Sequence, residues 1–498
     1  MCKVILFVAL VLMSPMLALA DAMDDCATSK GDAAIAACDQ AILQNPREPS
    51  FYFFRANAYF SKRDYPLAIP DYTKAMDLDP TNRSNYLNRG NAYTNMGDQD
   101  RAIADYTKAI ELDPTSSDPY FNRGNAYARK GEHDSAIADY TKTLELDPQH
   151  VQAYNNRGNR YGLKGDHDQA ITDYTKAIEL DPNFADPYQH RGNAFSDKGD
   201  HDRAIADYTK ALQLEPQNAR VHNSRGNAHM RKGAHDAAIA DYTKVIEFDP
   251  KSARVYTNRA DAYGAKDDHD QAIADNTKAI ELDPKSVDAY DNRGTSYRAK
   301  GDHDRAIADY TKTIELDPES DEVYRRRAHV FLIRGELDNA IADYDKAIEI
   351  DPKEANHLSE RGLARFSKGD FKTAADDLLK AIELGDGTYS VLLRYLAQAR
   401  TGDAAEAELE ANAARLKSKD WPFTVTELYL GKRSPAATLD EAVKPDDRCE
   451  AQFYVGQWHL LKGNRPEAEV ALKAAVANCP EDLPSRIAAT AELKRWKP

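Results

Sequence analysis

The sequence has little cysteine and tryptophan, and it lacks an excess of basic residues. Five cysteines in 498 residues are too few for a disulfide-scaffold protein. All three tryptophans (Trp421, Trp458 and Trp496) lie in the last fifth of the chain, which indicates that the C-terminal part is built differently from the rest. The 66 Lys and Arg residues stand against 82 Asp and Glu, a net charge of −16. This balance argues against a nucleic-acid binder, which needs a basic face.

Catalytic and metal-binding signatures are also missing. The sequence contains no GxxxxGK[ST], GxSxG, HExxH or CxxC motif. We therefore expect no enzyme, no cofactor and no metal site. Six histidines do recur at one constant interval: His133, His167, His201, His235, His269 and His303. We expect these histidines to be exposed residues of the turns. The alternative is that they share a metal ion, but their side chains are separated by the width of a helix pair, which is too far for Zn–N distances of about 2 Å.

The N-terminus has the pattern of an export signal. Lys3 precedes an apolar run at residues 4–13. The segment that follows ends in small residues at Ala20, as a cleavage site requires. This predicts a signal peptide over 1–20, cut after Ala20, and a periplasmic or secreted protein. An uncleaved membrane anchor is the alternative, but the run is short and is broken by Ser14-Pro15. No other long apolar run follows, so we expect no stable membrane insertion after cleavage.

One period organises most of the chain. Prolines recur every 34 residues from Pro46 through Pro80 to Pro352. Arginines recur every 34 residues from Arg55 to Arg361. In a typical repeat, residues 117–150, apolar or small residues fall at positions 4, 8 and 11 and again at 20, 24 and 27. Each set marks one face of a helix. A glycine at position 15 separates the two helices and Asp-Pro ends the second. Each repeat is therefore predicted to be a helical hairpin, with helices A and B.

These positions resemble the tetratricopeptide repeat (TPR). The resemblance covers ten repeats over 49–388, with a shortened repeat at 21–48 before them. It implies an all-α, right-handed superhelical solenoid of about twelve hairpins. After it we expect a degenerate repeat and connecting segment at 389–448, then a terminal hairpin and capping helix at 449–498. Arg at position 7, where the family often has Leu, is a systematic departure.

This arginine has an internal partner in the pattern. Every repeat with Arg at 7 has Asp at 23, for example Arg123 with Asp139 and Arg191 with Asp207. The two positions flank the apolar stripes of helices A and B. We expect a structural ion pair that ties the two helices together; a charged ligand site is the alternative.

The repeat frame also narrows the pairing of four cysteines. Cys26 and Cys38 fall on the two helices of the first repeat, and Cys449 and Cys479 fall at the start and end of the last hairpin. Antiparallel helices bring these positions together. We predict the disulfides Cys26–Cys38 and Cys449–Cys479, which suit an exported protein and repeats at the ends of a stack.

The family resemblance places ligand contacts on the concave face of helices A, with position 9 at its centre. Position 9 is asparagine in six successive repeats: Asn57, Asn91, Asn125, Asn159, Asn193 and Asn227. An amide offers donors and an acceptor, so the row is suited to an extended peptide; a purely structural role is the alternative. Arg129, Arg231 and Arg298, at positions 12 or 13, are expected to add contacts to carboxylates.

The C-terminal segment has a second resemblance. Residues 421–442, followed by CEAQFYVGQWHLLKG, are similar to the C-terminal part of bacterial envelope TPR adaptors of the new lipoprotein I type. The family role is to bring cell-wall hydrolases to other proteins, and no acylation cysteine is present here. A capping region without a partner is the alternative. The sequence thus favours a non-enzymatic envelope scaffold that binds proteins or extended peptides, cell-wall enzymes among them. The alternative is a cell-wall glycan or polysaccharide binder.

Overall fold

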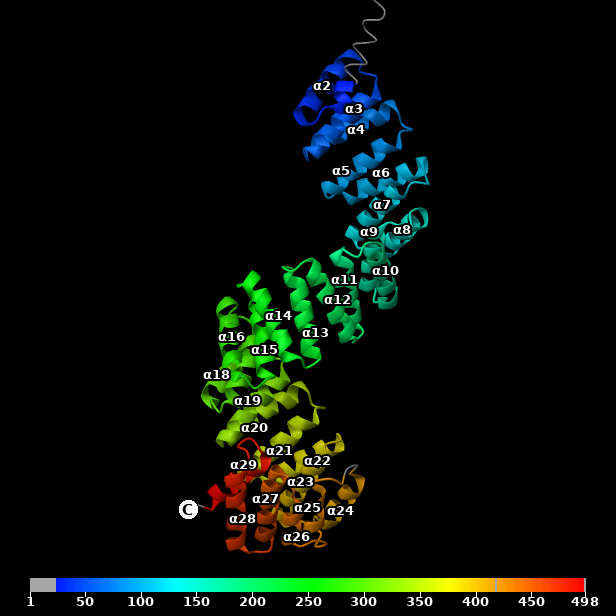
Figure 1. Cartoon of the computed structure of the whole chain (residues 1–498). Coiled ribbons are helices and arrows are strands. Elements are labelled where there is room, and N and C mark those ends of the chain that lie inside the picture. The colour runs from blue at the N-terminus through cyan, green and yellow to red at the C-terminus, as the bar shows by residue number, and fades with distance from the viewer. Residues whose placement is uncertain (1–23, 417–418, 497–498) are drawn as a thin grey trace, which may run out of the picture. The chain divides into compact units, whose positions relative to one another are not determined.

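The computed structural model describes residues 24–416 and 419–496, and every regular element among them is a helix. The expected signal peptide lies outside the described residues. The chain divides into two compact units, unit 1 (Met1–Phe248) and unit 2 (Asp249–Pro498). Each is a stack of helical hairpins (Figure 1), so the expected all-α fold is confirmed.

Unit 1 contains six full hairpins after a shorter N-terminal one. Its helices are α2 (Gly31–Gln44), α3 (Pro49–Ser61), α4 (Tyr65–Leu78), α5 (Arg83–Asn95), α6 (Gln99–Leu112), α7 (Ser117–Lys130), α8 (His133–Leu146), α9 (Val151–Leu163), α10 (His167–Leu180), α11 (Ala185–Asp197), α12 (His201–Leu214), α13 (Ala219–Arg231) and α14 (His235–Phe248).

Unit 2 continues the same pattern and then changes. Its hairpin helices are α15 (Ala253–Gly264), α16 (His269–Leu282), α17 (Val287–Ala299), α18 (His303–Leu316), α19 (Asp321–Arg334), α20 (Leu337–Ile350), α21 (Ala355–Lys368) and α22 (Phe371–Glu383). The C-terminal helices are α23 (Thr388–Thr401), α24 (Glu406–Arg415), α25 (Phe423–Tyr429), α26 (Pro435–Glu441), α27 (Pro445–Leu461), α28 (Arg465–Asn478) and α29 (Pro484–Arg495).

Local sequence signals set the ends of these helices. Helix α7 ends at Gly131, whose φ of 77° is in the left-handed region that glycine adopts without strain. Helix α6 begins after Asp98, whose carboxylate accepts a hydrogen bond from the Arg101 backbone N–H at 3.1 Å. The Asp-Pro pair at 113–114 follows α6 and ends it.

The core of each of the six full hairpins in unit 1 is a tyrosine of helix B that packs against helix A, in most of them against a glycine. Tyr140 is 1% exposed. A Cβ atom on Gly124 would lie 2.9 Å from Tyr140 Cε1, so the ring occupies the space that a side chain would need. The glycine at position 8 is therefore required by close helix packing and not by a turn.

The C-terminal helices form one larger core. It extends from α19 to α29 and includes buried residues such as Leu392, Val425 and Phe453. Helix α29 packs against α21, α27 and α28, and the three tryptophans pack at the edge of this core. Within the described ranges, no helix is both long and apolar enough to cross a membrane.

Candidate functional site

The arginine of each repeat forms a bidentate ion pair inside its own hairpin. Arg123 donates from Nε and Nη2 to the two carboxylate oxygens of Asp139, both at 2.8 Å, and Arg191 binds Asp207 with the same two distances. These hydrogen bonds raise the pKa of Arg123 and Arg191. The same geometry joins Arg55–Asp71, Arg89–Asp105, Arg157–Asp173, Arg225–Asp241, Arg259–Asp275, Arg293–Asp309, Arg327–Asp343 and Arg361–Asp377.

The remaining guanidinium nitrogen reaches the preceding hairpin. Arg123 Nη1 donates to Thr107 Oγ1 at 3.0 Å, and Arg191 Nη1 donates to Thr175 Oγ1 at 2.9 Å. These threonines occupy position 25, two positions after the aspartate, in the recurring DYTK segment. Each arginine thus fixes its own two helices and also its neighbour's helix B. This contact was not predicted, although the threonine recurs in the sequence.

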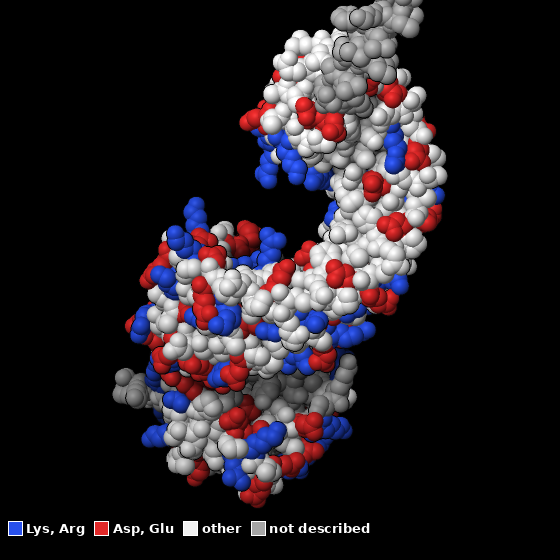
Figure 2. Space-filling view, turned by 45° about the horizontal axis from the view of Figure 1, so that its top comes forward, with Lys and Arg blue, Asp and Glu red and all other residues white. Residues whose placement is uncertain are grey.

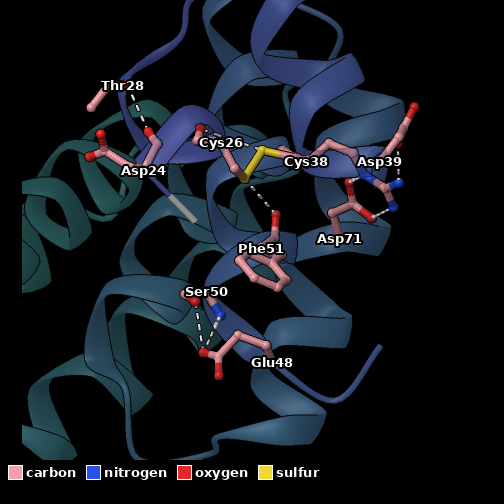
Figure 3. The surroundings of a disulfide bond; sticks show 10 residues. Asp24, Cys26, Thr28, Cys38, Asp39, Glu48, Ser50, Phe51 and Asp71 are labelled. Atoms are coloured by element: carbon pink, nitrogen blue, oxygen red, sulfur yellow. Dashed lines mark hydrogen bonds and ion pairs between the residues drawn. A yellow bond between two sulfur atoms is a disulfide. The ribbon is translucent and has the colours of Figure 1, made fainter. Parts of the chain in front are cut away.

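The four predicted cysteines lie in two pairs. Cys26 and Cys38 are joined by a disulfide with Cα atoms 4.6 Å apart, beside Phe51 of α3 (Figure 3). Cys449 and Cys479 are joined with Cα atoms 5.2 Å apart. All four side chains are buried, so each bridge lies within the core of its hairpin.

The asparagine row of unit 1 is tied to the tyrosine core. Asn125 Oδ1 accepts hydrogen bonds from the Tyr140 hydroxyl at 2.7 Å and from Asn156 Nδ2 of the next hairpin at 3.0 Å. The tyrosine bond recurs at Tyr72–Asn57, Tyr106–Asn91, Tyr174–Asn159, Tyr208–Asn193 and Tyr242–Asn227. Burial raises the pKa of Tyr140 to about 12, so it remains a donor. The carbonyl oxygens are therefore committed to the fold, whereas the amide nitrogens take no part in these bonds.

The three predicted arginines differ in their surroundings. Arg129 Nη1 donates to the Thr94 carbonyl oxygen of the preceding helix A at 3.3 Å. Arg231 lies at the end of α13. Arg298 lines a cavity of about 450 Å³ in unit 2. Within residues 24–416 and 419–496, the guanidinium groups of Arg231 and Arg298 form no ion pair or hydrogen bond.

In unit 2 the same face is charged instead of amide-lined. Position 9 becomes Asp261, Thr295, His329 and Leu363 in turn. The cavity beside Arg298 is also lined by Thr295, Arg325, Arg326, His329 and Glu360. Burial lowers the pKa of His329, which keeps the imidazole neutral.

The arginines of this cavity, apart from Arg298, already have partners. Arg325 pairs with Glu322 at 2.7 Å and with Glu360 at 2.8 Å. Arg326 pairs with Asp291 and with Glu322. An incoming anion would have to compete with these carboxylates for Arg325 and Arg326, whereas Arg298 is not so engaged.

A carboxylate with a raised pKa lies on the same face. Asp261 accepts from Asn292 Nδ2. Partial desolvation raises the pKa of Asp261 to about 7, and the charges of Asp288 and Asp291 add to the effect. Asp261 is nevertheless exposed at the surface, so water screens this effect.

The histidine row differs from the expectation of exposed turn residues. His269 and His303 have side chains that are 24% and 19% exposed. The next hairpin covers the turns, since Lys300 pairs with Asp270 beside His269. Among the described residues, no group of three His, Cys, Asp or Glu side chains is placed to hold a metal ion.

Acidic and basic side chains are interspersed over the described surface that Figure 2 shows. This agrees with the repeat pattern, in which surface pairs such as Lys142–Glu145 and Lys176–Glu179 recur along helices B. Such exposed pairs contribute little to stability, and the mixture of signs gives no reason to expect a polyanion site there.

Family comparisons agree with this architecture. Models described as TPR repeat match residues 56–97, 90–131, 158–199, 192–233 and 226–267, and models described as tetratricopeptide repeat match 117–150, 253–286, 292–355 and 327–388. The chain belongs to the tetratricopeptide repeat family. Proteins of this family are scaffolds suited to binding proteins and peptides.

Solved structures similar to the chain match between a third and a half of its length. The MamA structure is 32% identical and matches 34% of this chain and 94% of its own, with a TM-score of 0.33. YrrB, described as a TPR protein with an unusual peptide-binding site, is 27% identical over 37% of this chain and 95% of its own (TM-score 0.35). PilF of Pseudomonas aeruginosa is 20% identical over 44% and 97% (TM-score 0.38). No curated protein sequence matches the chain.

Proposed function

We propose that this chain is a non-enzymatic scaffold of the cell envelope that binds extended segments of other proteins along the faces of its A helices. The amide row of unit 1 carries the proposal. Neighbouring packed helices lie about 10 Å apart, and an extended chain rises about 3.3 Å per residue. The row therefore presents one amide donor for about every third residue of a ligand, which suits backbone carbonyl groups and requires no particular ligand side chain.

The rigid mounting of the row supports the proposal. Each asparagine is held through Oδ1 by a buried tyrosine, and each hairpin is held by its Arg–Asp pair, as at Asn159 with Tyr174 and Arg157 with Asp173. Donors that are already fixed lose little conformational entropy when a ligand binds. The face is thus preorganised for an extended segment.

Export of the protein is part of the proposal. The N-terminal sequence has the signal-peptide pattern, and two disulfides are characteristic of proteins in an oxidising compartment. Fractionation of the native host should place the protein in the periplasm or the medium, with its four disulfide cysteines resistant to alkylation until reduced. A cytoplasmic protein with free thiols would contradict this part.

A peptide selection tests the binding face. The full chain is used to select from a random dodecapeptide library displayed on phage, and the selected peptides are then synthesised and titrated. Replacing the asparagines by aspartates (Asn125→Asp, Asn159→Asp and Asn193→Asp) keeps the oxygen that accepts from tyrosine but removes the amide donors. We expect binding to weaken roughly tenfold or more, since three hydrogen bonds are lost.

A control variant changes the charge by the same amount, at residues on the B helices of the same three hairpins. The variant Lys142→Gln, Lys176→Gln and Lys210→Gln also makes the net charge more negative by three, and these lysines sit on helices B. We expect unchanged peptide affinity. Equal affinity of the asparagine variant would contradict the proposed face, and sedimentation of the protein with purified cell wall, without any selected peptide, would favour a glycan binder.

A further inference from the structure

The tenth hairpin has leucine at both positions of the tyrosine–asparagine pair. Position 9 is Leu363 and position 24 is Leu378, where the hairpins of unit 1 have the hydrogen-bonded Asn and Tyr. Both leucines are buried, at 7% and 1% exposure. Leucine is smaller than tyrosine, and neither leucine can form the polar contact. The floor of the A-helix face is therefore apolar at this hairpin, where the hairpins of unit 1 have a polar pair.

The structure contains a cavity at this place. Its volume is about 210 Å³, and its apolar lining comes from Leu363, Leu378, Leu393, Phe453, Tyr454 and the ring of Tyr389. Ligand pockets for whole small molecules hold about 300–1,000 Å³. The smaller space here suits one apolar side chain rather than a complete ligand. We call it the leucine pocket.

An aromatic ring is held at the edge of the leucine pocket. Tyr389 is 48% exposed, and its hydroxyl donates to Glu450 at 3.0 Å. Glu450 is buried and also accepts from Trp421 Nε1 at 2.9 Å. These bonds fix the ring while its face stays accessible, and a rigid, partly exposed aromatic is the kind of contact that anchors a partner's apolar side chain.

The leucine pocket adjoins the charged cavity described above. Glu360 of α21 lines both. Arg298 of α17 lies in the charged cavity, and one A helix, α19, lies in sequence between α17 and α21. Two steps between neighbouring packed helices correspond to on the order of 20 Å, or about six residues of an extended chain.

We propose that this part of unit 2 binds an extended peptide segment that inserts one apolar side chain into the leucine pocket and places a carboxylate, about six residues away, on Arg298. The inference rests on the proposed function and names the class of segment that is bound. The charges decide where the carboxylate lies. Arg325 and Arg326 are paired with acids, whereas Arg298 is not. Glu360 and Asp386 at the leucine pocket disfavour an acidic residue directly beside the anchor.

The chain itself suggests a variant that makes the floor of the pocket polar. Leu363→Asn with Leu378→Tyr restores the pair that six hairpins of unit 1 already contain. Gly362 keeps the space that a tyrosine ring needs, because glycine holds the same place opposite Tyr140 and most of the other tyrosines of unit 1. The variant is therefore expected to fold, which circular dichroism and the melting temperature check directly.

The test uses the same phage-displayed dodecapeptide library on the full chain. Peptides selected by the unaltered protein should include a group with a Leu, Met or Phe about six residues from an Asp or Glu. The variant Leu363→Asn with Leu378→Tyr should bind these synthetic peptides about tenfold or more weakly, because the peptide's apolar side chain can no longer be buried in the leucine pocket. Arg298→Gln should weaken them only when the peptide carries the acid. Lys312→Gln, which makes the same change of charge on helix B of the same hairpin, should leave them unchanged.

The outcomes separate the two proposals. If peptides are selected and their binding depends on the asparagine row but not on Leu363, Leu378 or Arg298, the leucine pocket proposal is overturned and the proposed function stands. If the unaltered protein selects no peptide at all, both are overturned. If the pocket variant abolishes binding but the peptides carry no apolar residue, the assigned class of segment is wrong.

Discussion

The hydroxyl of Tyr174 donates a hydrogen bond of 2.8 Å to Asn159 Oδ1. The tyrosine belongs to the core of the hairpin, being 3% exposed, and the asparagine belongs to the face proposed to meet a ligand. One bond thus joins packing and recognition. A change at the asparagine acts on both, so any test of binding has to separate the loss of a ligand contact from the loss of a stabilising bond.

The two functions of Asn159 are separable by the choice of substitution. Asn159→Ala leaves the Tyr174 hydroxyl buried without its acceptor, which costs about 1–3 kcal/mol. Asn159→Asp retains an oxygen at the same place and should cost less. Urea unfolding of the two variants measures the difference. An alanine variant as stable as the aspartate variant would show that the bond contributes nothing.

The ion pair between Arg191 and Asp207 should couple strongly. Asp207 is buried, and removal of one partner of a buried pair costs about 3–5 kcal/mol because the other charge is left uncompensated. Arg191→Met and Asp207→Leu are each expected to be severe, while the double variant is expected to be less destabilised than the sum. A double-mutant cycle on the free energy of unfolding measures the coupling; additive effects would argue against the pair.

The stability of unit 2 should depend on pH through Asp261. Its pKa in the folded chain is raised to about 7, above the value of about 3.9 in an unfolded chain. Between these values the folded state binds more protons than the unfolded state, so stability falls as the pH rises from about 4 to 7. The melting temperature should fall less over this range in Asp261→Asn than in the unaltered protein. Parallel curves for the two proteins would show that Asp261 titrates normally.

The N-terminal disulfide should stabilise its own hairpin rather than the whole chain. The residues Cys26 and Cys38 are 12 apart in sequence, and closing a loop of this size contributes about 3 kcal/mol on the loop-entropy estimate. Because repeats contact only their neighbours, Cys26→Ser with Cys38→Ser should increase hydrogen exchange in α2 and α3 and leave α11 and α12 unchanged. A uniform increase along the chain would contradict this local effect.

The sequence predicted most features that repeat and few that depend on distant contacts. The constant spacing of Arg and Pro was enough to predict helical hairpins, and the paired occurrence of Arg at 7 and Asp at 23 indicated their contact. The use of Asn Oδ1 by tyrosine was not predicted, because a helical wheel shows which face a residue occupies but not which atom is already bonded.

The leucine pocket could not be predicted from the repeat pattern alone. The departures at Leu363 and Leu378 are visible in the sequence, but the walls from Phe453 and Tyr454 come from α27, far along the chain from both leucines. Helix α29 likewise packs on α21, with Arg495 Nη1 donating to the Phe366 carbonyl oxygen at 3.2 Å. Such pairings follow from the way degenerate hairpins pack, for which the sequence has no repeated signal.

From Arg89 to Arg225, each arginine donates a hydrogen bond to the threonine of the preceding hairpin, which makes the length of this part of unit 1 adjustable only in whole repeats. If the repeat at 151–184 were removed, Arg191 would meet Thr141 in place of Thr175, and the contact at the junction would be regenerated by residues of the same type. A deletion of part of a repeat would misalign donors and acceptors at the junction. Unit 1 can therefore gain or lose binding length one hairpin at a time without a new interface having to arise.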